Sequence, residues 1–291
     1  MARDRITTGL RGRCGGVLLA VLALALAACA PAAPTAPQHP AQPTPAHPTI
    51  VSLNPCLDAI LVAIAPPAQV LALSHYSRDA ASSSIPAATA ARYGVTGGTA
   101  EEVIAARPDL VLASIFLPQS TRSALERAGL RVETFGSPTS IAESADQVRA
   151  VAALAGRGGE GEALAARIAA RPARPSGPPV DALLWQPGEI VAGEQTLVSE
   201  LLREAGFASD AARRGLRQAD RVSLESVLAD PPQVLLVAGD AAGQRHPLLA
   251  GQLKGAHIAA FDPSLIYCGG PTILRARARL AEIRRAVEAR P

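Results

Sequence analysis

The chain has 291 residues, 48% of them hydrophobic, which is enough for one large or two modest domains with a sizeable core. Its formal net charge of +3 comes from the first 13 residues, where four arginines stand against Asp4, so the rest of the chain is neutral. A neutral body without a stretch dense in Lys and Arg argues against nucleic acid as a partner.

The first 28 residues have the pattern of an export signal. A basic start is followed by 12 apolar residues at 17–28, too few to cross about 30 Å of hydrocarbon but typical of a signal-peptide core. The run ends in Leu26-Ala27-Ala28-Cys29, which resembles a bacterial lipobox. We therefore expect residues 1–28 to be removed and Cys29 to carry lipid, with cleavage after an ordinary Ala-x-Ala-like site as the alternative.

Residues 29–48 follow with 7 prolines and almost no charge. Such a segment cannot build a core and favours the extended polyproline II conformation. We interpret it as a tether between the lipid and a folded body, and the alternative is a tail without a function.

The first half of the body alternates strands and helices. Strands are expected at 49–53, 70–74, 110–114 and 130–135, and helices at 56–65, 100–107 and 121–129. Thr99 and Ser140 each begin a Ser/Thr-x-x-Glu capping box, and the second opens a long helical stretch to about residue 171. The glycines at 156–161 are a possible interruption. They match Gly-x-Gly-x-x-Gly but follow a helix instead of a strand, so no nucleotide loop is expected.

After the Pro-rich break at 172–179 the alternation resumes. Strands are expected at 182–186, 233–239 and 258–262, and helices at 196–207, 223–229 and 272–289. This order predicts an α/β protein with parallel sheets and helices on both faces.

One segment of the first half is also similar in sequence to one segment of the second half. EEVIAARPDLVLAS at 101–114 and ESVLADPPQVLLVAG at 225–239 align without a gap at an offset of 124. This repeated segment predicts two similar α/β lobes. A ligand is then expected in the cleft between the lobes, beyond the carboxyl ends of the strands. The alternative is that helix-proline-strand is simply common in α/β proteins.

The order of the motifs VSLNP, LALSHYS, GGTAEEVIAARPDLVLAS and ADRVSLESVLADPPQVLLVAG resembles the periplasmic binding proteins of ABC importers for ferric siderophores and cobalamin. The resemblance covers nearly all of the body. It implies two Rossmann-like lobes with parallel sheets, 49–139 and 172–291, bridged by one long helix within 140–171. It also implies a monomer in the periplasm or cell envelope, lipid-anchored to a membrane, that passes a ferric siderophore, cobalamin or haem-like chelate to a permease and ATPase.

The resemblance implies a function for the glutamate that begins each repeated segment. In the family, one exposed Glu on each lobe docks onto arginines of the permease, and the matching positions are Glu101 and Glu225. The alternative is that both are ordinary acids in a first helical turn, where the helix dipole favours them.

Strand ends predict which residues line the cleft. The first lobe would contribute Asn54, Cys56, His75, Tyr76, Gly97 and Gly98, and the second Trp185, Gln186, Arg245, Tyr267 and Cys268. Aromatic walls suit large, partly apolar chelates. Aromatic residues make up only 3% of the chain, however, and two cobalamin-stacking positions of the family fall on Val95 and Ser114, which argues against cobalamin. Packing is the alternative role for Tyr76, Trp185 and Tyr267.

Cys56 and Cys268 permit three interpretations. They are buried free thiols, or a disulfide that clamps the cleft, or soft ligands that hold a metal, haem iron or cobalt centre together with His75. The sequence does not decide between them.

Three other functions compete with chelate import. A bare-metal site would draw on His75, His246 and His257, the only histidines of the body. A sensing lipoprotein without transport has no sequence feature that separates it from an importer. An enzyme is not expected, because the chain has no Gly-x-Ser-x-Gly elbow, P-loop or His-Glu-x-x-His motif. No intrinsic cofactor is expected either, so iron or cobalt would arrive with the ligand.

Overall fold

The computed structural model describes residues 46–240, 244, 246–253 and 255–289. The predicted signal peptide, the predicted lipid attachment site Cys29, most of the predicted tether and Arg245 lie outside these residues. Residues 44–291 form one compact unit that contains two sheets. Within the described residues, no helix is both long enough and apolar enough to span a membrane.

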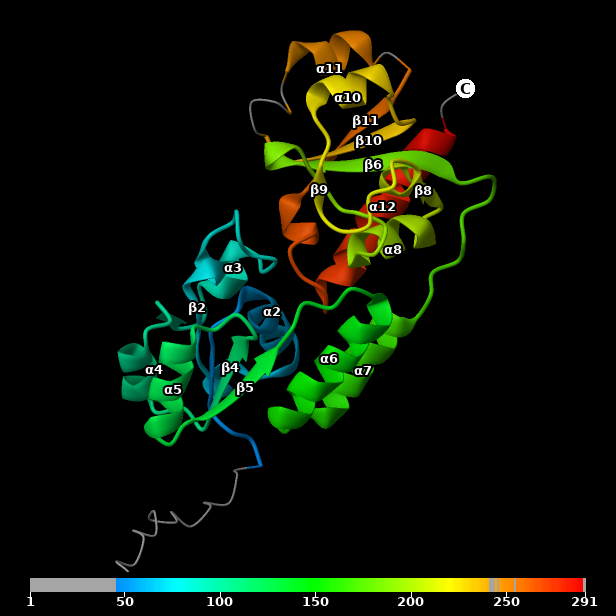
Figure 1. The fold of residues 1–291 in the computed structure, drawn as a ribbon. Helices are drawn as coiled ribbons and strands as arrows, with labels where there is room; N and C mark the ends of the chain where they lie inside the picture. Colours follow the sequence, from blue (N-terminus) through cyan, green and yellow to red (C-terminus); the bar gives the residue numbers. More distant parts are fainter. Residues whose placement is uncertain (1–45, 241–243, 245, 254, 290–291) are drawn as a thin grey trace, which may run out of the picture. The chain divides into compact units, whose positions relative to one another are not determined.

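The first sheet is entirely parallel (Figure 1). Its strands run in the order β3-β2-β1-β4-β5. Their bounds are β1 Ile50–Ser52, β2 Val70–Ser74, β3 Val95–Thr96, β4 Leu110–Ser114 and β5 Arg131–Phe135. Since all strands point the same way, their carboxyl ends meet at one edge, where binding residues are expected.

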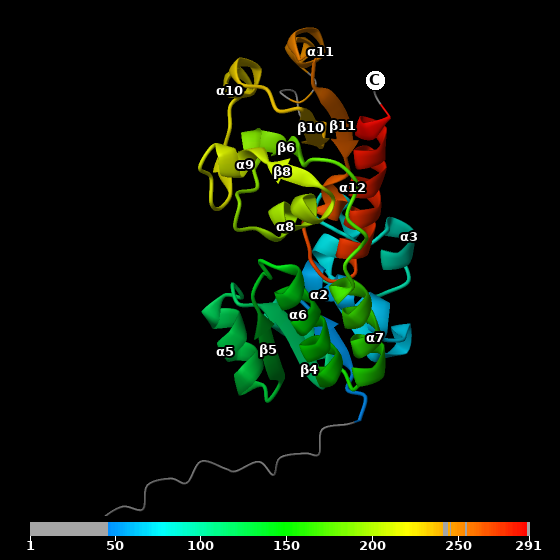
Figure 2. The ribbon, with the colours of Figure 1, turned by 90° about the vertical axis from the view of Figure 1, so that its right-hand side faces the viewer.

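Helices cover both faces of this sheet (Figure 2). They are α2 Pro55–Ile64, α3 Ala87–Ala90, α4 Ala100–Ala106 and α5 Gln119–Arg127, followed by α6 Ile141–Leu154 and α7 Gly158–Ala169. Side chains alternate along each strand, so Ile50 packs with α2 and α6 while its neighbour Val51 packs with α4 and α5. These elements confirm the predicted order of strands and helices in the first half.

The bridge between the lobes is two helices and not the one long helix that the resemblance implies, which confirms the possible interruption at 156–161. α6 ends at Leu154 and α7 begins at Gly158, and the two helices lie side by side in both views (Figures 1 and 2). Gly156 makes the turn because its φ of +67° is a left-handed conformation that residues with a side chain avoid. Gly161 then permits close packing, since a Cβ there would lie 2.1 Å from the Cβ of Ala152. The glycines of the Gly-x-Gly-x-x-Gly match therefore build a helix hairpin.

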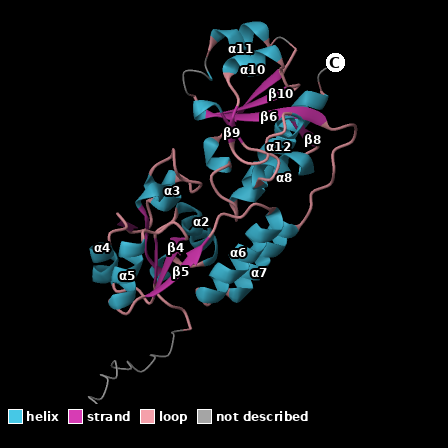
Figure 3. Cartoon of the chain, in the orientation of Figure 1, coloured by secondary structure: helices cyan, strands magenta, loops and turns pink. Residues whose placement is uncertain are grey.

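The second sheet is mostly parallel. Its strands, like those of the first sheet, are magenta in Figure 3. Its order is β11-β10-β6-β7-β9, with β8 also paired to β6, and β7 runs antiparallel to both of its neighbours. The bounds are β6 Val180–Gln186, β7 Ile190–Val191, β8 Phe207–Ser209, β9 Asp220–Arg221, β10 Val234–Ala238 and β11 His257–Phe261.

The helices of this half are α8 Leu197–Glu204, α9 Asp210–Arg213, α10 Leu224–Ala229, α11 Pro247–Gln252 and α12 Thr272–Glu288. Leu184 of β6 packs in the core with α8 and α12, whereas Leu183 and Trp185 face α10 and α11. The sheet is thus covered on both faces, as the alternation predicts.

The repeated segments, 101–114 and 225–239, form equivalent elements in the two halves. Thr99 and Ser223 each cap a short helix, α4 or α10, through a side-chain oxygen that accepts a backbone N–H. Each helix leads through a proline into a buried strand, β4 or β10. The structure therefore confirms an α/β fold with two mostly parallel sheets.

Candidate functional site

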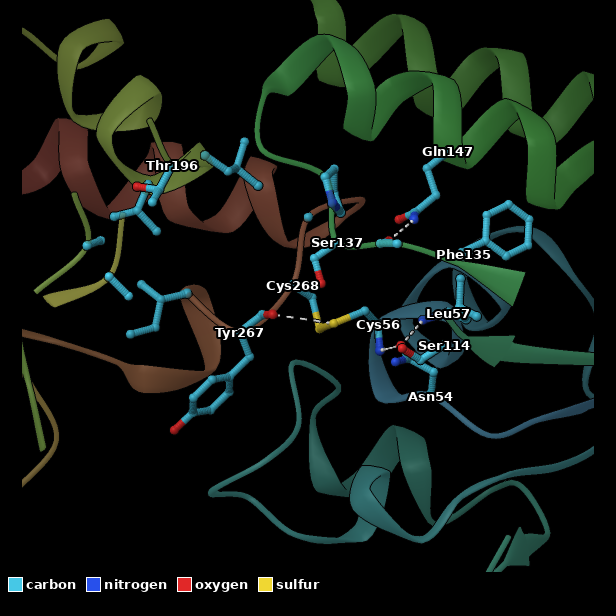
Figure 4. A pocket seen from close by; sticks show the side chains of 18 of the residues that line it. Asn54, Cys56, Leu57, Ser114, Phe135, Ser137, Gln147, Thr196, Tyr267 and Cys268 are labelled. Carbon is cyan, nitrogen blue, oxygen red and sulfur yellow. Dashed lines mark hydrogen bonds between the residues drawn. A yellow bond between two sulfur atoms is a disulfide. The ribbon is translucent and has the colours of Figure 1, made fainter. Parts of the chain in front are cut away.

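A cavity of about 250 Å³ lies where the first sheet ends and meets residues of the second half (Figure 4). Asn54, Ser114 and Phe135 belong to the carboxyl ends of β1, β4 and β5. The opposite wall comes from the end of β6, the start of α8 and the segment before α12. The lining residues are Asn54, Cys56, Leu57, Ser114, Phe135, Gly136, Ser137, Pro138, Gln147, Gln186, Ala192, Thr196, Leu197, Val198, Ala219, Ile266, Tyr267, Cys268 and Gly269.

Asn54 fixes the local structure on the first-sheet side. Its Oδ1 accepts hydrogen bonds from the backbone N–H groups of Cys56 at 2.9 Å and Leu57 at 3.2 Å. Pro55 at the first helical position lacks an N–H and is preorganised for a helix, so the sequence Asn-Pro starts α2 at this place. The cap presents Cys56 at the cavity wall.

Cys56 and Cys268 form a disulfide across 212 positions, with their Cα atoms 5.1 Å apart. The predictions of free thiols and of metal ligation with His75 are therefore wrong, because a disulfide sulfur is not a thiolate. The Cys56 Sγ also lies 3.4 Å from the carbonyl oxygen of Tyr267. This is a contact and not a hydrogen bond, since a disulfide carries no S–H proton. Both residues line the cavity, so the disulfide closes part of the opening.

The segment after Cys268 packs tightly against α6. The Gly270 N–H donates to the Ser144 Oγ at 2.6 Å. A Cβ at Gly269 would lie 2.5 Å from the same oxygen, so only glycine fits there. Residues 268–270 are thereby fixed to the first half by a covalent bond, a hydrogen bond and close contact.

Of the predicted cleft residues, Asn54, Cys56, Gln186, Tyr267 and Cys268 are brought together in this cavity. The others that the structure describes are not among its lining residues. His75 and Tyr76 follow β2, with ring centroids 4.0 Å apart, and Tyr76 is 46% exposed. The Gly97 N–H donates to the Glu102 Oε2 at 2.6 Å, which holds the Gly97-Gly98 turn against the start of α4.

The prediction for Trp185 is wrong. Its side chain is 1% exposed and belongs to the core between β6 and the helices α10 and α11. Its Nε1–H donates to the carbonyl oxygen of Val222 at 2.8 Å, so the polar end of the ring is also satisfied inside. Alternation along β6 explains the error, because the neighbouring Gln186 reaches the cavity instead.

Sequence reasoning missed much of the cavity wall. The missed lining includes Ser137 and Pro138 after β5, Gln147 of α6, and Thr196, Leu197 and Val198 at the start of α8. The strand-end rule applied to 130–135 could have found Phe135 to Pro138. Nothing in the sequence marks Gln147, which reaches the site because α6 lies beside the end of β5.

The cavity is electrically neutral among its described lining residues, which include no Asp, Glu, Lys, Arg or His. In the described part of the chain as a whole, no group of three or more His, Cys, Asp or Glu side chains could hold a metal ion. The cavity can therefore offer hydrogen bonds and apolar contact, but no charged partner from these residues.

One buried carboxylate lies behind the cavity wall, on the first turn of α2. The Asp58 Oδ2 accepts hydrogen bonds from the Ser74 N–H at 3.0 Å and from the hydroxyls of Ser74 and Ser77 at 2.6 Å each. These bonds tie α2, which carries Cys56, to the segment that carries His75 and Tyr76. Burial raises the pKa of Asp58 to about 7, against the opposing effect of the serine hydrogen bonds.

We expect Asp58 to make stability depend on pH. A raised pKa means that the folded protein keeps this proton where the unfolded chain, with an ordinary value of 3.8, loses it. The stabilisation is complete below pH 3.8 and is lost progressively as the pH rises to about 7, up to about 4 kcal/mol in all. Urea unfolding at several pH values should show this loss in the wild type and not in Asp58→Asn. Equal pH slopes would contradict the assignment, and the exposed Asp146→Asn serves as control.

Comparisons with known proteins give one family and a set of similar folds. The profile of a family described as periplasmic binding protein matches residues 50–254. The periplasmic haem-binding protein RhuT of Roseiflexus sp. RS-1, in its apo form, is 24% identical with a TM-score of 0.62, over 83% of this chain and 98% of that one.

Two proteins of Vibrio cholerae are also similar in fold. The periplasmic haem-binding protein HutB is 19% identical with a TM-score of 0.66, over 82% of this chain and 99% of that one. The periplasmic vitamin B12-binding protein BtuF is 19% identical with a TM-score of 0.62, over 83% and 98%. No curated protein sequence matches the chain.

Proposed function

Because the chain belongs to the family of periplasmic binding proteins, we propose that it is the solute-binding component of an ABC importer for a metal chelate. The observation that carries the proposal is the cavity at the carboxyl ends of β1, β4 and β5, closed from the other side by residues of the second half. This is where ligands bind in open parallel sheets. We propose that the protein acts as a monomer and delivers its ligand to a membrane permease and its ATPase.

The ligand class follows from the neighbours and from the apolar surface near the site. Of the three similar structures described above, two are haem-binding proteins and one binds vitamin B12, which supports a haem-like or corrinoid ligand. A ferric siderophore is the further candidate that the sequence resemblance implies. The cavity volume of about 250 Å³ is below the 300–1,000 Å³ typical of pockets that enclose a whole small molecule. Only part of a chelate would enter it, and the exposed rings of Tyr76 and Tyr267 could cover another part.

Filling the cavity tests the proposal. We expect Ala192→Trp, on the cavity wall, to weaken binding at least about tenfold, because the indole takes the space of the ligand. Isothermal titration of the purified chain with haem, cobalamin and ferric siderophores is the measurement. Ala153→Trp, on the exposed side of α6, should leave binding unchanged. Unaltered affinity in Ala192→Trp would place the ligand elsewhere.

The alternative functions receive less support. Capture of a bare metal ion would draw on His75, His246 and His257, but no group of three or more His, Cys, Asp or Glu side chains in the described residues could hold a metal ion. Sensing without transport would use the same cavity, so it is separated from import only by measuring ligand uptake in cells that lack the protein.

We propose that the protein is exported and anchored through Cys29. Removal of residues 1–28 would leave lipid on this cysteine and 29–48 as the tether to the lobes 49–139 and 172–291 and the linker 140–171. Cys29→Ala should then prevent incorporation of a radioactive fatty acid, and normal labelling of that variant would disprove the anchor.

We propose Glu101 and Glu225 as the contacts with the permease. Both are exposed in the first turn of a short helix, at equivalent places in the two halves. A pair of carboxylates, one on each half, offers two separate contacts for arginines of a partner.

A further inference from the structure

The polar side chains that line the cavity carry no charge among the described residues. Among the described lining residues they are neutral amides and hydroxyls, namely those of Asn54, Ser114, Ser137, Gln147, Gln186, Thr196 and Tyr267. Several keep unused capacity. The Asn54 Oδ1 is occupied by the cap of α2, which leaves its NH₂ group, and the Gln147 Nε2 donates to the Gly136 carbonyl at 2.7 Å, which leaves its Oε1. The Ser114 Oγ accepts from the Phe116 N–H at 3.2 Å and still has a proton to donate.

Helix N-termini also attract anions, and side chains cap part of those beside the cavity. Asn54 takes the N–H groups of Cys56 and Leu57 at the start of α2. At the start of α8, the Thr196 Oγ1 accepts the Ser199 N–H at 3.4 Å. These backbone donors are therefore not available to a ligand.

The N-cap of α6 is Ser140, and two carboxylates also accept backbone N–H groups at this helix start. The Glu200 Oε2 accepts the Ile141 N–H at 2.7 Å, and the Glu143 Oε2 accepts the Thr139 N–H at 2.7 Å. The bonds from Thr139 hold the pKa of Glu143 below its usual value, so this side chain is ionised at neutral pH. Glu143 follows the lining residues Ser137 and Pro138, and Glu200 follows Leu197 and Val198.

From this geometry we propose that the cavity selects a chelate whose inserted part is uncharged and rich in amide, hydroxamate or hydroxyl groups. The inference rests on the proposed function and narrows its ligand class. A carboxylate or catecholate pushed into the cavity would lose its hydration, and none of the described lining residues is a cation that could pair with it. A neutral amide would exchange water for the free groups of Asn54, Gln147 and Gln186 at little cost.

Four probes test the selection by calorimetric titration of the full chain. Cyanocobalamin and a neutral ferric trihydroxamate present amide or hydroxamate groups, whereas haem carries propionates and a ferric tricatecholate is trianionic. We expect at least one neutral probe to bind at least about tenfold more tightly than either anionic one. In Gln186→Lys the preference should shrink by at least about tenfold, because the new ammonium pairs with an anion. Gln119→Lys, on the exposed start of α5, should not change it.

The outcomes distinguish the selection of neutral ligands by the cavity from the capture of a chelate by the protein. If haem or the tricatecholate binds as tightly as the neutral probes, the neutral selection is overturned while chelate capture stands. A preference for neutral probes that Gln186→Lys leaves intact would also overturn it, since the selection would then arise outside the cavity. If none of the four probes binds, the proposed function fails and the inference falls with it. Thermal unfolding of each variant verifies that it is folded.

Discussion

Removal of the Cys56–Cys268 disulfide is expected to lower the free energy of unfolding by about 5 kcal/mol, which is the chain-entropy value for a closed loop of this length. The bond joins residues 212 positions apart and therefore restricts most of the folded chain when it unfolds. The double variant Cys56→Ser/Cys268→Ser should show the loss as a lower urea midpoint. The wild type should fall to the same midpoint when it is unfolded in reductant.

The single variants provide the control. Since one missing sulfur already breaks the bond, Cys56→Ser and Cys268→Ser should each lose nearly as much stability as the double variant, so their effects should not add. Reductant should leave the double variant unaffected. Additive effects of the two single variants, or a wild type insensitive to reductant, would show that the two thiols are not joined in the protein. Non-reducing peptide mapping should find the linked pair directly.

The disulfide also bears on how the cavity works. Residues 268–270 are held to the first half through Cys56, Ser144 and the close approach at Gly269. Because this attachment lies at the cavity wall, breaking the bond should change ligand affinity as well as stability. Titration of the double variant with a probe that the wild type binds would measure that coupling separately from unfolding.

Local chemistry made most elements predictable from the sequence. The strands VLALS and LVLAS are read correctly because apolar, β-branched-containing runs between turn signals have few other solutions. The N-caps at Thr99 and Ser140 are confirmed, because each side-chain oxygen accepts the N–H three positions on. The capping boxes are not completed, since Glu102 accepts from Gly97 and Glu143 from Thr139 instead of from the cap N–H. The possible interruption at 156–161 is also confirmed, and it lies at the single left-handed residue Gly156.

The candidate site was harder because it depends on contacts between distant segments. Strand ends were found, so Asn54 and Gln186 were placed at the cavity. Trp185 was misplaced because the strand-end rule does not say which of two neighbouring residues faces the cavity, and the pleat of β6 directs that ring into the core. The partner of Cys56 could not be chosen among the alternatives, because only the three-dimensional structure brings Cys268 within bonding distance.

Reversal of the charge at both Glu101 and Glu225 is expected to abolish ligand uptake by cells while leaving ligand binding intact. Glu101 and Glu225 are exposed on α4 and α10 and are not among the residues that line the cavity. In Glu225 the pKa is lowered by hydrogen bonds from its own backbone N–H and from Ser223, which favours the ionised form that an arginine would pair with. Replacement by arginine turns each expected attraction into like-charge repulsion, at one place in each half.

We therefore expect Glu101→Arg/Glu225→Arg to reduce uptake at limiting ligand at least about 100-fold, and each single variant to reduce it less. Affinity in solution should stay within about twofold of the wild type, since long-range effects of exposed charges are screened by salt. The matched control is Glu126→Arg/Glu282→Arg, which reverses one exposed glutamate in each half, on α5 and α12. Uptake should survive in that control, in cells that depend on this protein for the ligand. If the control loses uptake as fully as the Glu101/Glu225 pair, or if the pair retains it, then docking does not depend on these two positions.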